Sequence, residues 1–571
     1  MSPLPTAAVE VVVDGAPVDN KYLQQLLEVQ VRDNLLLPDT ATVRLRDPDG
    51  TYIASHPFKL GAALEVKLGA RGDNAAASVF KGEIVTLEPE FTEDCVIAVR
   101  AYDRGHRLNR NRRSRTFQNQ TASDMVRTVV SEAGLAAGTV EATGVVHDYF
   151  QQSMETDWEF CWRLAAMHDF EFVVDDRRCH FRKRKLAGAA AVLTWGENLL
   201  AFKPRQSVVG QVQSVTVANH DPKARAPLTG SASSPAVNGT SAAAKERSTA
   251  IGKFGASTVV VADRVVTTGS EATKIAQSTL DRLSGSYLEA DGRAFGSPKL
   301  RAGATITTAK VGPFSGDYVL SQTMHTIRSG DQYTTSFSIS GRTGHGITDL
   351  LRGGEKRSQW SSHLVIGVVT NNNDPDGMGR VRVKYPALGS DIEGWWARVA
   401  TINAGKERGV FMLPAVDDEV IVAFEHGDPR RPFILGSLYH GKAKPPADLH
   451  DTKERKSLFG VKSDTRVHVE GKQSMTLRTG EKMTVEVNRD GQGGTGDYLL
   501  DAKGNITDKA AQNFKVEAGQ NIELKANSSV KITGSASVTI ETTGSLKLKG
   551  STVDIEGTGP VNVKGAIINL G

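Results

Sequence analysis

Residues 529 to 550 read SVKITGSASVTIETTGSLKLKG, and this stretch decides how the C-terminal part of the chain folds. Its apolar residues come in pairs that start eight residues apart, namely Val530/Ile532, Val538/Ile540 and Leu546/Leu548. A polar residue separates the two members of each pair, so both apolar side chains point to the same side of a short strand. The stretch therefore predicts a repeated unit of one short strand with two inward side chains, followed by a turn.

The eight-residue period extends well beyond that stretch. It starts at Val467, is interrupted by residues 488 to 505, shortens to a seven-residue step at Val553 and ends with Ile568/Leu570. Glycine or asparagine falls between many of the pairs, where the chain has to turn a corner. The predicted inward residues are Val467, Val469, Met475, Leu477, Met483, Val485, Ile506, Phe514, Val516, Ile522, Leu524, Val530, Ile532, Val538, Ile540, Leu546, Leu548, Val553, Ile555, Val561 and Val563.

One repeat is too short to form a complete coil of a β-helix. A β-helix made by a single chain needs about three faces per coil, whereas each repeat here supplies one. We therefore expect two further copies of the chain to supply the other faces, in an intertwined trimeric β-helix shaped as a triangular prism. With strands about 4.8 Å apart, about eleven repeats would form a needle of roughly 50 Å. The alternative is a β-meander packed on a second sheet, which the aromatic content of only 6% disfavours.

The composition suits a soluble protein rich in strands and turns. The 571 residues include 56 glycines, and 69 basic against 65 acidic residues give a net charge of +4, so no global attraction to nucleic acid is expected. Cys95, Cys161 and Cys179 form an odd set without a CxxC pair, which favours a reducing compartment. The N-terminus does not read as a signal peptide, so we expect synthesis and assembly in the cytoplasm, within a particle that could later be released or act across an envelope.

The residues before the repeats predict further β-structure. Alternating segments up to about residue 100, and again to about residue 342, indicate antiparallel strands in barrel-like parts. Helices are expected within TASDMVRTVVSEAGL and TDWEFCWRLAAMHD, in an insert of about 117 to 170, and near residues 271 to 284. Residues 222 to 250, rich in Pro, Ser, Gly and Ala, predict an exposed loop between strands.

A compact β block follows a polar joint at residues 343 to 362. Five or six short strands in residues 363–441, among them GVFMLPAV at 409 to 416, fit a small barrel such as an OB-fold. The expected organisation is mainly β, with barrel-like domains at 1–350, the OB-fold at 363–441, a connector at 442–465 and the octapeptide-repeat β-helix needle at 466–571.

The barrel block carries a family resemblance. NNNDPDGMGRVRVKYPALGSDIEGWWARVA and GVFMLPAVDDEVIVAFEHGDPRRPFILGSLYHG resemble the OB-fold of VgrG-type spike proteins of contractile injection machines. Upstream, YDRGHRLNRNRRSRTFQNQTASDMVRTVVSEAGL resembles the hub of the same family, although His220 stands where many relatives carry Trp. The segments DPDGMGRVRVKYP and RRPFILGSLYHG are more similar to those of extracellular contractile injection systems and phage-tail-like particles than to those of common type VI forms. The signature residues are Gly379, Arg380, Gly427, Asp428, Pro429, Pro432, Leu435, Gly436 and Tyr439.

The resemblance implies a homotrimeric hub, formed by residues 1–350, and a spike, formed by residues 466–571, at the centre of a baseplate. Such a part adapts a threefold needle to the sixfold inner tube and pierces a target envelope mechanically when the sheath contracts. The implied partners are two more copies of the chain, the inner tube protein, baseplate proteins, cargo effectors and, transiently, the target membrane. A PAAR-type tip protein would dock on the last residues, Ile567, Ile568, Asn569, Leu570 and Gly571.

The sequence supports a catalytic or metal-binding role less well than the mechanical role that the resemblance implies. Cys161 with His168, and Cys179 with His180, could supply a thiol and a base, but their apolar surroundings in the sequence favour core positions. Only about 25 residues separate Gly441 from Val467, too few for a lysozyme domain, and no cysteine or histidine follows His468 to bind a metal at the tip. We expect no catalytic residue, cofactor or metal; the alternatives are a receptor-binding fibre and a spike with hidden peptidoglycan-hydrolase activity.

A basic run could suggest nucleic-acid binding. Because no aromatic residues are interleaved to stack bases, we expect instead contacts to neighbouring subunits or to an acidic partner. The run comprises Arg104, Arg107, Arg110, Arg112, Arg113 and Arg115.

Overall fold

The computed structural model describes residues 8–47, 50, 57–70, 76–91, 95–235, 239–340, 360–389, 391–446, 459–463, 466–487 and 496–569. The chain divides into two units, Met1–Gly460 and Val461–Gly571. The predicted joint at 343 to 362 and connector at 442–465 lie largely outside the described residues, so their limits stay predictions. Within the described residues, no helix is long and apolar enough to cross a membrane.

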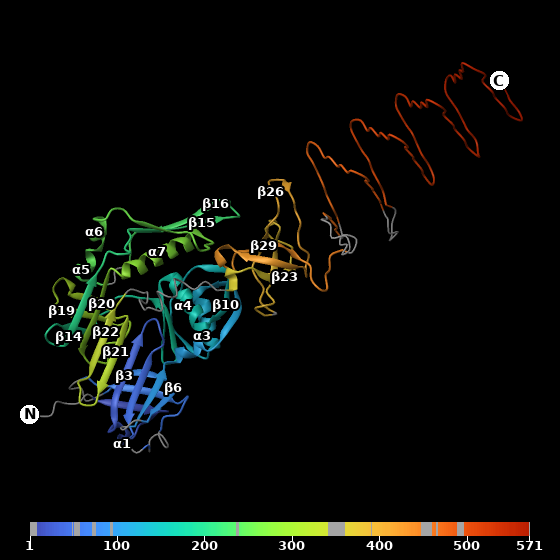
Figure 1. Cartoon of the computed structure of the whole chain (residues 1–571). Helices are drawn as coiled ribbons and strands as arrows, with labels where there is room; N and C mark the ends of the chain where they lie inside the picture. Colours follow the sequence, from blue (N-terminus) through green and yellow to red (C-terminus); the bar gives the residue numbers. More distant parts are fainter. Residues whose placement is uncertain are drawn as a thin grey trace, which may run out of the picture. The chain divides into compact units, whose positions relative to one another are not determined.

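One eleven-stranded sheet organises the first unit (Figure 1). Its strand order is β14-β18-β22-β21-β3-β4-β7-β6-β5-β1-β2. The antiparallel pairing of β21 with β3, which sets Gln322 opposite Asn34, joins strands that are far apart in the sequence. Its strands are β1 (Val9–Val13), β2 (Ala16–Pro17), β3 (Leu26–Asn34), β4 (Thr40–Arg46), β5 (Ala63–Leu68), β6 (Ala77–Glu90), β7 (Val96–Tyr102), β14 (Leu199–Gln206), β18 (Leu288–Phe295), β21 (Gln322–Arg328) and β22 (Thr334–Ile339).

The sheet follows the alternation that the sequence predicts. On β3 and β4, alternate residues such as Val29, Val31 and Val43 are buried, while their neighbours are partly exposed. The short helix α1 (Asn20–Leu23) lies between β2 and β3 in the sequence, and its Tyr22 joins the same core.

The predicted helical insert forms a second core. Two helices, α3 (Ala122–Glu132) and α4 (Asp157–His168), confirm the helices expected from the sequence, and each starts with a capping box. The capping residues are Thr121 with Asp124 and Thr156 with Glu159. The accompanying elements are η1 (Arg104–Asn109), β8 (Arg112–Thr121), β9 (Ala136–Val140), β10 (Val146–Thr156), β11 (Phe170–Asp175) and β12 (Arg178–Lys183).

Helix α7 (Gly269–Gly285) confirms the third predicted helix and packs on a small sheet of β15 (Ser214–Asp221), β16 (Ala226–Ala232) and β17 (Thr258–Val261). The loop predicted at 222 to 250 is therefore wrong, because β16, α5 (Ala242–Lys245) and α6 (Arg247–Gly252) occupy much of it. Small residues serve close packing here: a Cβ on Gly230 would lie 2.2 Å from the backbone nitrogen of Thr273 in α7. The remaining hub elements are β13 (Ala191–Thr194), β19 (Thr305–Ala309), η2 (Gly312–Phe314) and β20 (Gly316–Val319).

The block after residue 360 closes into a barrel, in the order β23-β24-β25-β29-β28. Its core includes Val369, Val381, Val422 and Ile434, all buried. The mainly β fold with a closed five-stranded barrel confirms the predicted fold class. Its elements are η3 (Trp360–Ser362), β23 (Val365–Asn371), β24 (Arg380–Lys384), β25 (Ala397–Val399), β28 (Glu419–Phe424), η4 (Glu425–Gly427) and β29 (Pro432–Leu438).

GVFMLPAV, predicted as a barrel strand, is wrong. After the two-residue strands β26 (Ala404–Gly405) and β27 (Arg408–Gly409), residues 410 to 416 form no strand, and Phe411 and Met412 are 75% and 63% exposed. Pro414 has no backbone N–H to donate to a neighbouring strand, which explains why the barrel closes without this segment.

The second unit contains neither helix nor strand in its described residues 461–463, 466–487 and 496–569. We call these residues the repeat coil. In Figure 1 it is the orange-to-red trace, which winds in wide successive turns.

Candidate functional site: the barrel–hub joint and the repeat coil

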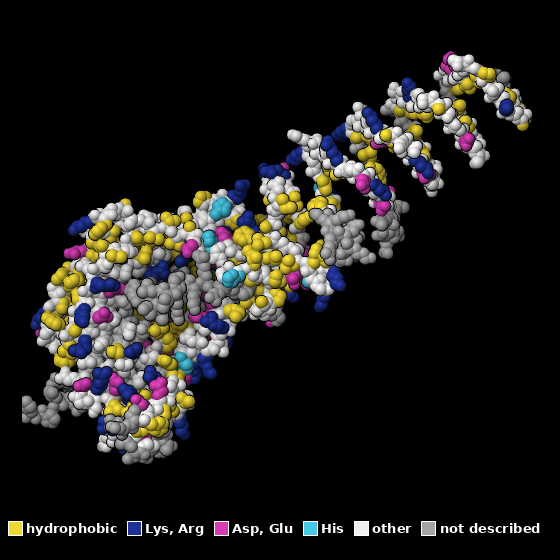
Figure 2. Space-filling view, in the orientation of Figure 1, with side chains coloured by type: hydrophobic (Ala, Val, Ile, Leu, Met, Phe, Trp, Pro, Cys, Tyr) yellow, Lys and Arg dark blue, Asp and Glu magenta, His cyan; other side chains and the backbone are white. Residues whose placement is uncertain are grey.

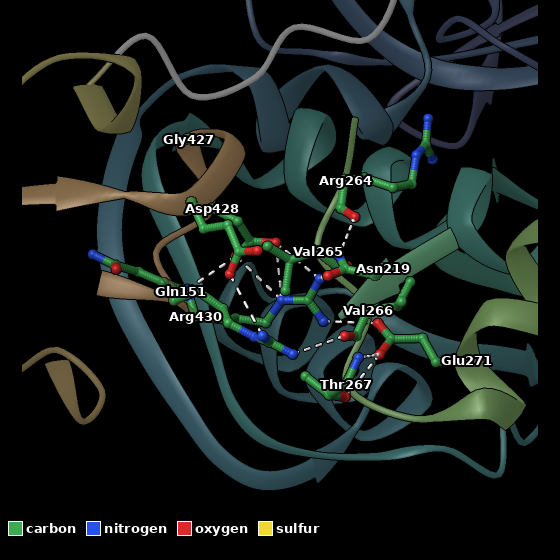
Figure 3. A network of polar contacts seen from close by, with 12 residues as sticks. Gln151, Asn219, Arg264, Val265, Val266, Thr267, Glu271, Gly427, Asp428 and Arg430 are labelled. Carbon is green, nitrogen blue, oxygen red and sulfur yellow. Dashed lines mark hydrogen bonds and ion pairs between the residues drawn. The ribbon is translucent and has the colours of Figure 1, made fainter. Parts of the chain in front are cut away.

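The loop between β28 and β29 carries the longest part of the family signature. Gly427 at its start has a φ of +71°, a backbone conformation that favours glycine. Asp428 then accepts a hydrogen bond from the backbone nitrogen of Arg430 at 2.9 Å. This turn directs Arg430 out of the barrel and into the hub (Figure 3). Arg431 also reaches the hub, where it donates to the Val266 carbonyl.

Arg430 is the centre of a polar network that connects the barrel to the hub (Figure 3). Its guanidinium donates to Glu271 Oε1 at 2.7 Å, to the Val265 carbonyl at 2.7 Å and to Asp428 Oδ2 at 2.8 Å. The same guanidinium lies 5.5 Å from the ring centroid of Phe150. Every contact has a donor facing an acceptor or an aromatic ring, so this buried charge is well satisfied.

The electrostatics of this pair reflect its burial. Burial acts to raise the pKa of Glu271, but Arg430 and hydrogen bonds from Thr267 lower it to about 2. Burial acts to lower the pKa of Arg430, but Asp428 and Glu271 raise it above its usual value. Both groups are therefore ionised at neutral pH, and each depends on the other being present.

Three further contacts join the barrel to the hub. Arg431 donates to the carbonyls of His220 and Val266, both at 3.1 Å. Lys223, in the turn between β15 and β16, forms an ion pair with Asp376 at 2.8 Å. We call these contacts, the Arg430 network and the Tyr149 contact described next the barrel–hub joint.

The Tyr149 contact is partly aromatic. The ring of Tyr149 stacks on that of Trp395 with centroids 5.7 Å apart, and its hydroxyl donates to the Glu393 carbonyl at 3.1 Å. Hub and barrel are thus fastened by ionic, hydrogen-bonding and aromatic contacts at separate places. Such a joint can transmit force between two domains.

Buried histidines lie near the joint. Among the described residues, neither ring nitrogen of His147 has a hydrogen-bond partner, and burial lowers the pKa of this histidine. Burial and the neighbouring His147 lower the pKa of His168 to about 4. Both rings are therefore neutral at pH 7.

The remaining signature residues lie around the barrel wall. Arg380 pairs with Asp374 at 2.6 Å and with Asp376 at 2.7 Å, which fixes the loop before β24. A Cβ on Gly379 would lie 2.8 Å from the ring of Phe411. Pro429 lies in the loop between β28 and β29, and Pro432 is the first residue of β29. The side chains of Leu435 and Tyr439 are exposed. Gly436 pairs with Ile421 beside a bulge.

The cysteines occupy core positions. Cys161 and Cys179 are buried, and burial raises the pKa of Cys179 to about 12, which is unfavourable for a thiolate nucleophile. Within the described residues, no group of three or more His, Cys, Asp and Glu side chains is placed to hold a metal ion.

Five of the six arginines of the basic run pair with carboxylates of this chain. Arg104 and Arg107 bond to Glu83, and Arg113 and Arg115 bond to Asp157. Arg112 pairs with Glu159 at 3.3 Å. The acidic partners lie within the same hub, and contacts of the run to other subunits or to an acidic partner stay a prediction.

The repeat coil exposes all of its predicted inward residues, and Figure 2 shows hydrophobic side chains in yellow along its successive turns. The twenty-one side chains, from Val467 to Val563, are between 52% and 72% exposed in the single chain. The structure therefore does not bring them together within one chain, and their place in a trimer core stays a prediction.

The corners of the repeat coil need small residues. Glycine recurs four positions after the first apolar residue of a repeat, as at Gly471, Gly534 and Gly550. A Cβ at these positions would lie 2.4 to 2.8 Å from the carbonyl oxygens of Ser474, Ser537 and Thr552, respectively. Of the predicted tip residues, Ile567, Ile568 and Asn569 are exposed, whereas Leu570 and Gly571 lie outside the described residues.

The sequence analysis did not identify Arg430 and Glu271 as a pair. They are 159 positions apart, and Glu271 reads first as an acidic residue in the first turn of α7. The two successive arginines in GDPRRP were the available signal, because a tight loop rarely needs two cations unless they have acceptors nearby.

Two families match the chain. Residues 4–329 match the family described as Alg8 N-terminal domain, and residues 365–439 match the type VI secretion system/phage-baseplate injector OB domain. The first match covers more than half of the 571 residues.

Known relatives agree with the match to the injector OB domain. The type VI secretion system spike protein VgrG5 of Pseudomonas aeruginosa is 28% identical over 216 residues, which cover 33% of this chain and 27% of that protein. The spike protein VgrG3 of Vibrio cholerae is 38% identical over 87 residues, 14% of this chain and 9% of that protein. The matched segments thus span about a quarter or less of these relatives.

A solved structure is similar over most of the chain. It is the E. coli c3393 protein, described as a component of the type VI secretion system with structural similarity to the T4 tail proteins gp27 and gp5. The similarity has a TM-score of 0.47 at 16% identity, and it covers 75% of this chain and 99% of that one.

Proposed function

The chain belongs to the Alg8 N-terminal domain family and to the VgrG-type spike proteins, which gives it a baseplate or spike role, and on that premise we propose that it acts as a homotrimer. In this proposal the hub and barrel of three chains form the centre of a baseplate, and three repeat coils wind into one needle. The hub adapts the threefold needle to a sixfold inner tube, and the needle pierces a target envelope when the machine contracts.

The exposure of the repeat coil is the single observation that carries the proposal. Twenty-one apolar side chains are more than half exposed, and no strand forms in the described part of the coil. Burying one such side chain stabilises a protein by about 1.5–3 kcal/mol, so a coil that leaves them all in water is unfavourable. Two further copies would cover the apolar pairs and supply strand partners for the backbone.

The barrel–hub joint supports a mechanical role. A piercing spike must carry a load from the hub to the needle without the domains separating. The buried Arg430–Glu271 pair, the two carbonyl contacts of Arg431 and the Lys223–Asp376 pair resist such separation at different points. No enzyme activity is needed for this function, and the matched relatives named above are spike proteins.

The proposed partners follow from the proposed position in the machine. They are the inner tube protein, other baseplate proteins, cargo effectors and a PAAR-type tip protein at Ile567, Ile568 and Asn569. Assembly would take place in the cytoplasm, and contact with a target membrane would occur only during injection.

The oligomeric state of the purified full-length chain tests the proposal. We expect sedimentation equilibrium and native mass spectrometry to give three times the chain mass of 61.3 kDa. A stable monomer at micromolar concentration would overturn the trimer. Deletion of the protein should also leave particles without assembled baseplates, as seen by electron microscopy.

A further inference from the structure

A second regular pattern runs along the repeat coil, three positions after the first apolar residue of each repeat. Acidic and basic residues alternate there, and no two neighbouring members of the series carry the same charge. We call this series the outer charge row: Glu470, Arg478, Glu486, Lys509, Glu517, Lys525, Thr533, Glu541, Lys549, Glu556 and Lys564.

The row lies on the side of the coil opposite to the apolar pairs. In the first repeat, His468 Nε2 lies 3.4 Å from Glu470 Oε2, and in a later repeat Lys515 forms an ion pair with Glu517. Each contact joins the residue between two apolar side chains to the row member two positions later. Because side chains two apart in an extended chain share a face, both positions point away from the apolar pair.

The proposed trimer determines which row members become neighbours. We take each chain to move to the next face of the prism at every repeat. The consecutive repeats that lie on one face then come from the first, the second and the third chain in turn. Adjacent strands then lie about 4.8 Å apart, so Glu541 of one chain is next to Lys549 of a second chain. Lys549 is in turn next to Glu556 of the third chain.

We propose that the outer charge row is a register-setting interface between copies of this chain, in which each acid–base contact joins two different chains. This inference rests on the proposed trimer and names the residues that align it. Opposite charges on directly neighbouring strands stabilise a sheet, and like charges destabilise it.

The apolar core cannot set the register by itself. Nearly every repeat presents the same type of apolar pair, so a chain that slips by one repeat still fills the core. The same slip places Glu541 beside Glu556, or Lys549 beside Lys564. The row therefore distinguishes the correct register from one that the core accepts.

Charge reversal at one position tests the row in the full-length protein. Lys549→Glu would place three acidic residues on consecutive strands of every face. We expect its trimer to dissociate at a lower temperature than the unmodified trimer at low ionic strength, and the difference to shrink in about 1 M salt, where the Debye length is about 3 Å. Lys503→Glu changes the net charge equally outside the row, and we expect it to leave the dissociation temperature unchanged.

Reversal of a complete block provides the matched control. Glu541→Lys, Lys549→Glu, Glu556→Lys and Lys564→Glu together keep both the net charge and the alternation. The neutral Thr533 precedes this block, and residues 565–571, which come after it, carry no charged side chain. We expect this quadruple variant to recover the dissociation temperature that Lys549→Glu loses.

Co-expression of the unmodified and quadruple chains with different tags tests whether the contacts join chains. Random mixing would give about three quarters mixed trimers, whereas we expect at least about a fivefold depletion of them, since several contacts would become like-charged together. Random mixing, or a Lys549→Glu trimer as stable as the unmodified one, would overturn the row and leave the trimer intact. An unmodified chain that is monomeric would overturn the proposed function and the row with it.

Discussion

The barrel and the repeat coil share the same local sequence pattern, but the barrel buries its apolar side chains whereas the coil exposes them. On β24, Val381 and Val383 form an apolar pair separated by one polar residue, and the closed barrel buries both completely. In the coil, Val538 and Ile540 have the same spacing, and both remain more than half exposed. Alternation therefore predicts which side chains face a core, but it does not say which chain provides that core.

The difference lies in whether each segment finds hydrogen-bonding partners elsewhere in the same chain. Every barrel strand finds antiparallel or parallel neighbours within residues 365 to 438, so five short strands close on themselves. The coil turns away after each repeat, and no neighbouring segment returns to pair with it within its described residues. A short fixed period thus favours association between chains over closure within one.

Val538→Asp should produce the largest effect, because it acts on the region that lacks an internal core. In the proposed trimer, three carboxylates would lie near one axis without hydrogen-bond partners. We expect loss of the trimer, measured as a shift to the monomer mass in sedimentation equilibrium, while the barrel and hub stay folded.

Thr539→Asp is the matched control for that variant. It adds the same carboxylate one residue later, on the outer face between apolar Val538 and Ile540. We expect its trimer to survive. Normal trimers from Val538→Asp would remove the contrast between the two regions, since the coil would then not need an apolar core.

Glu271→Ala should have the next largest effect, and it acts on the self-contained region. The change leaves the buried guanidinium of Arg430 without its hub carboxylate. We expect a loss of about 3 kcal/mol in the free energy of unfolding, because removing one partner of a buried pair leaves an uncompensated charge. Calorimetry of the full-length protein would measure it.

Glu88→Ala provides the comparison for Glu271→Ala. Glu88 pairs with Arg100 at 2.9 Å, but both side chains are about half exposed. We expect a loss below about 1 kcal/mol. Equal losses from the two variants would mean that the joint is not a special anchor.

Acidification should weaken the hub by a smaller amount. The pKa of His168 is lowered to about 4, below its ordinary value of about 6.5, so the neutral ring stabilises the fold above pH 6.5. That contribution is lost as the pH falls through 4, and we expect about 2 kcal/mol in a denaturant titration. His168→Gln should flatten this dependence, whereas an unchanged pH profile would contradict the assignment to His168.

Gly534→Ala should have the smallest effect and tests the corners of the coil. A Cβ there would lie 2.4 Å from the Ser537 carbonyl oxygen, so the corner must shift. We expect a cost of about 1 kcal/mol per chain, seen as a lower dissociation temperature of the trimer. Gly519→Ala, whose Cβ would lie within 4 Å of no atom in the described part of the chain, should leave that temperature unchanged.

Much of the fold follows from local sequence patterns. The three longer helices could be predicted because Thr121, Thr156 and Thr268 cap them and apolar residues recur at helical spacing. The barrel could be predicted from its short alternating strands and from its signature. These features depend on residues close together in the sequence.

The parts that the sequence analysis missed depend on distant partners. Strand β16 looks like a loop because its small residues are chosen for close packing under α7, which the strand itself does not reveal. The segment around Phe411 looks like a strand, but Pro414 interrupts its hydrogen bonding. The pairing of Arg430 with Glu271 joins two domains, and no local pattern contains both residues.

The winding of the coil in Figure 1 also bears on how a needle could come apart. Three chains that wrap around one another cannot separate by moving sideways; each must be unwound through about four turns, if three repeats make one turn. Assembly would begin next to the barrels, which hold the three chains at high effective concentration, and would close toward the tip. The persistence of such a needle would therefore be set by a rate of unwinding as well as by the free energy of its contacts.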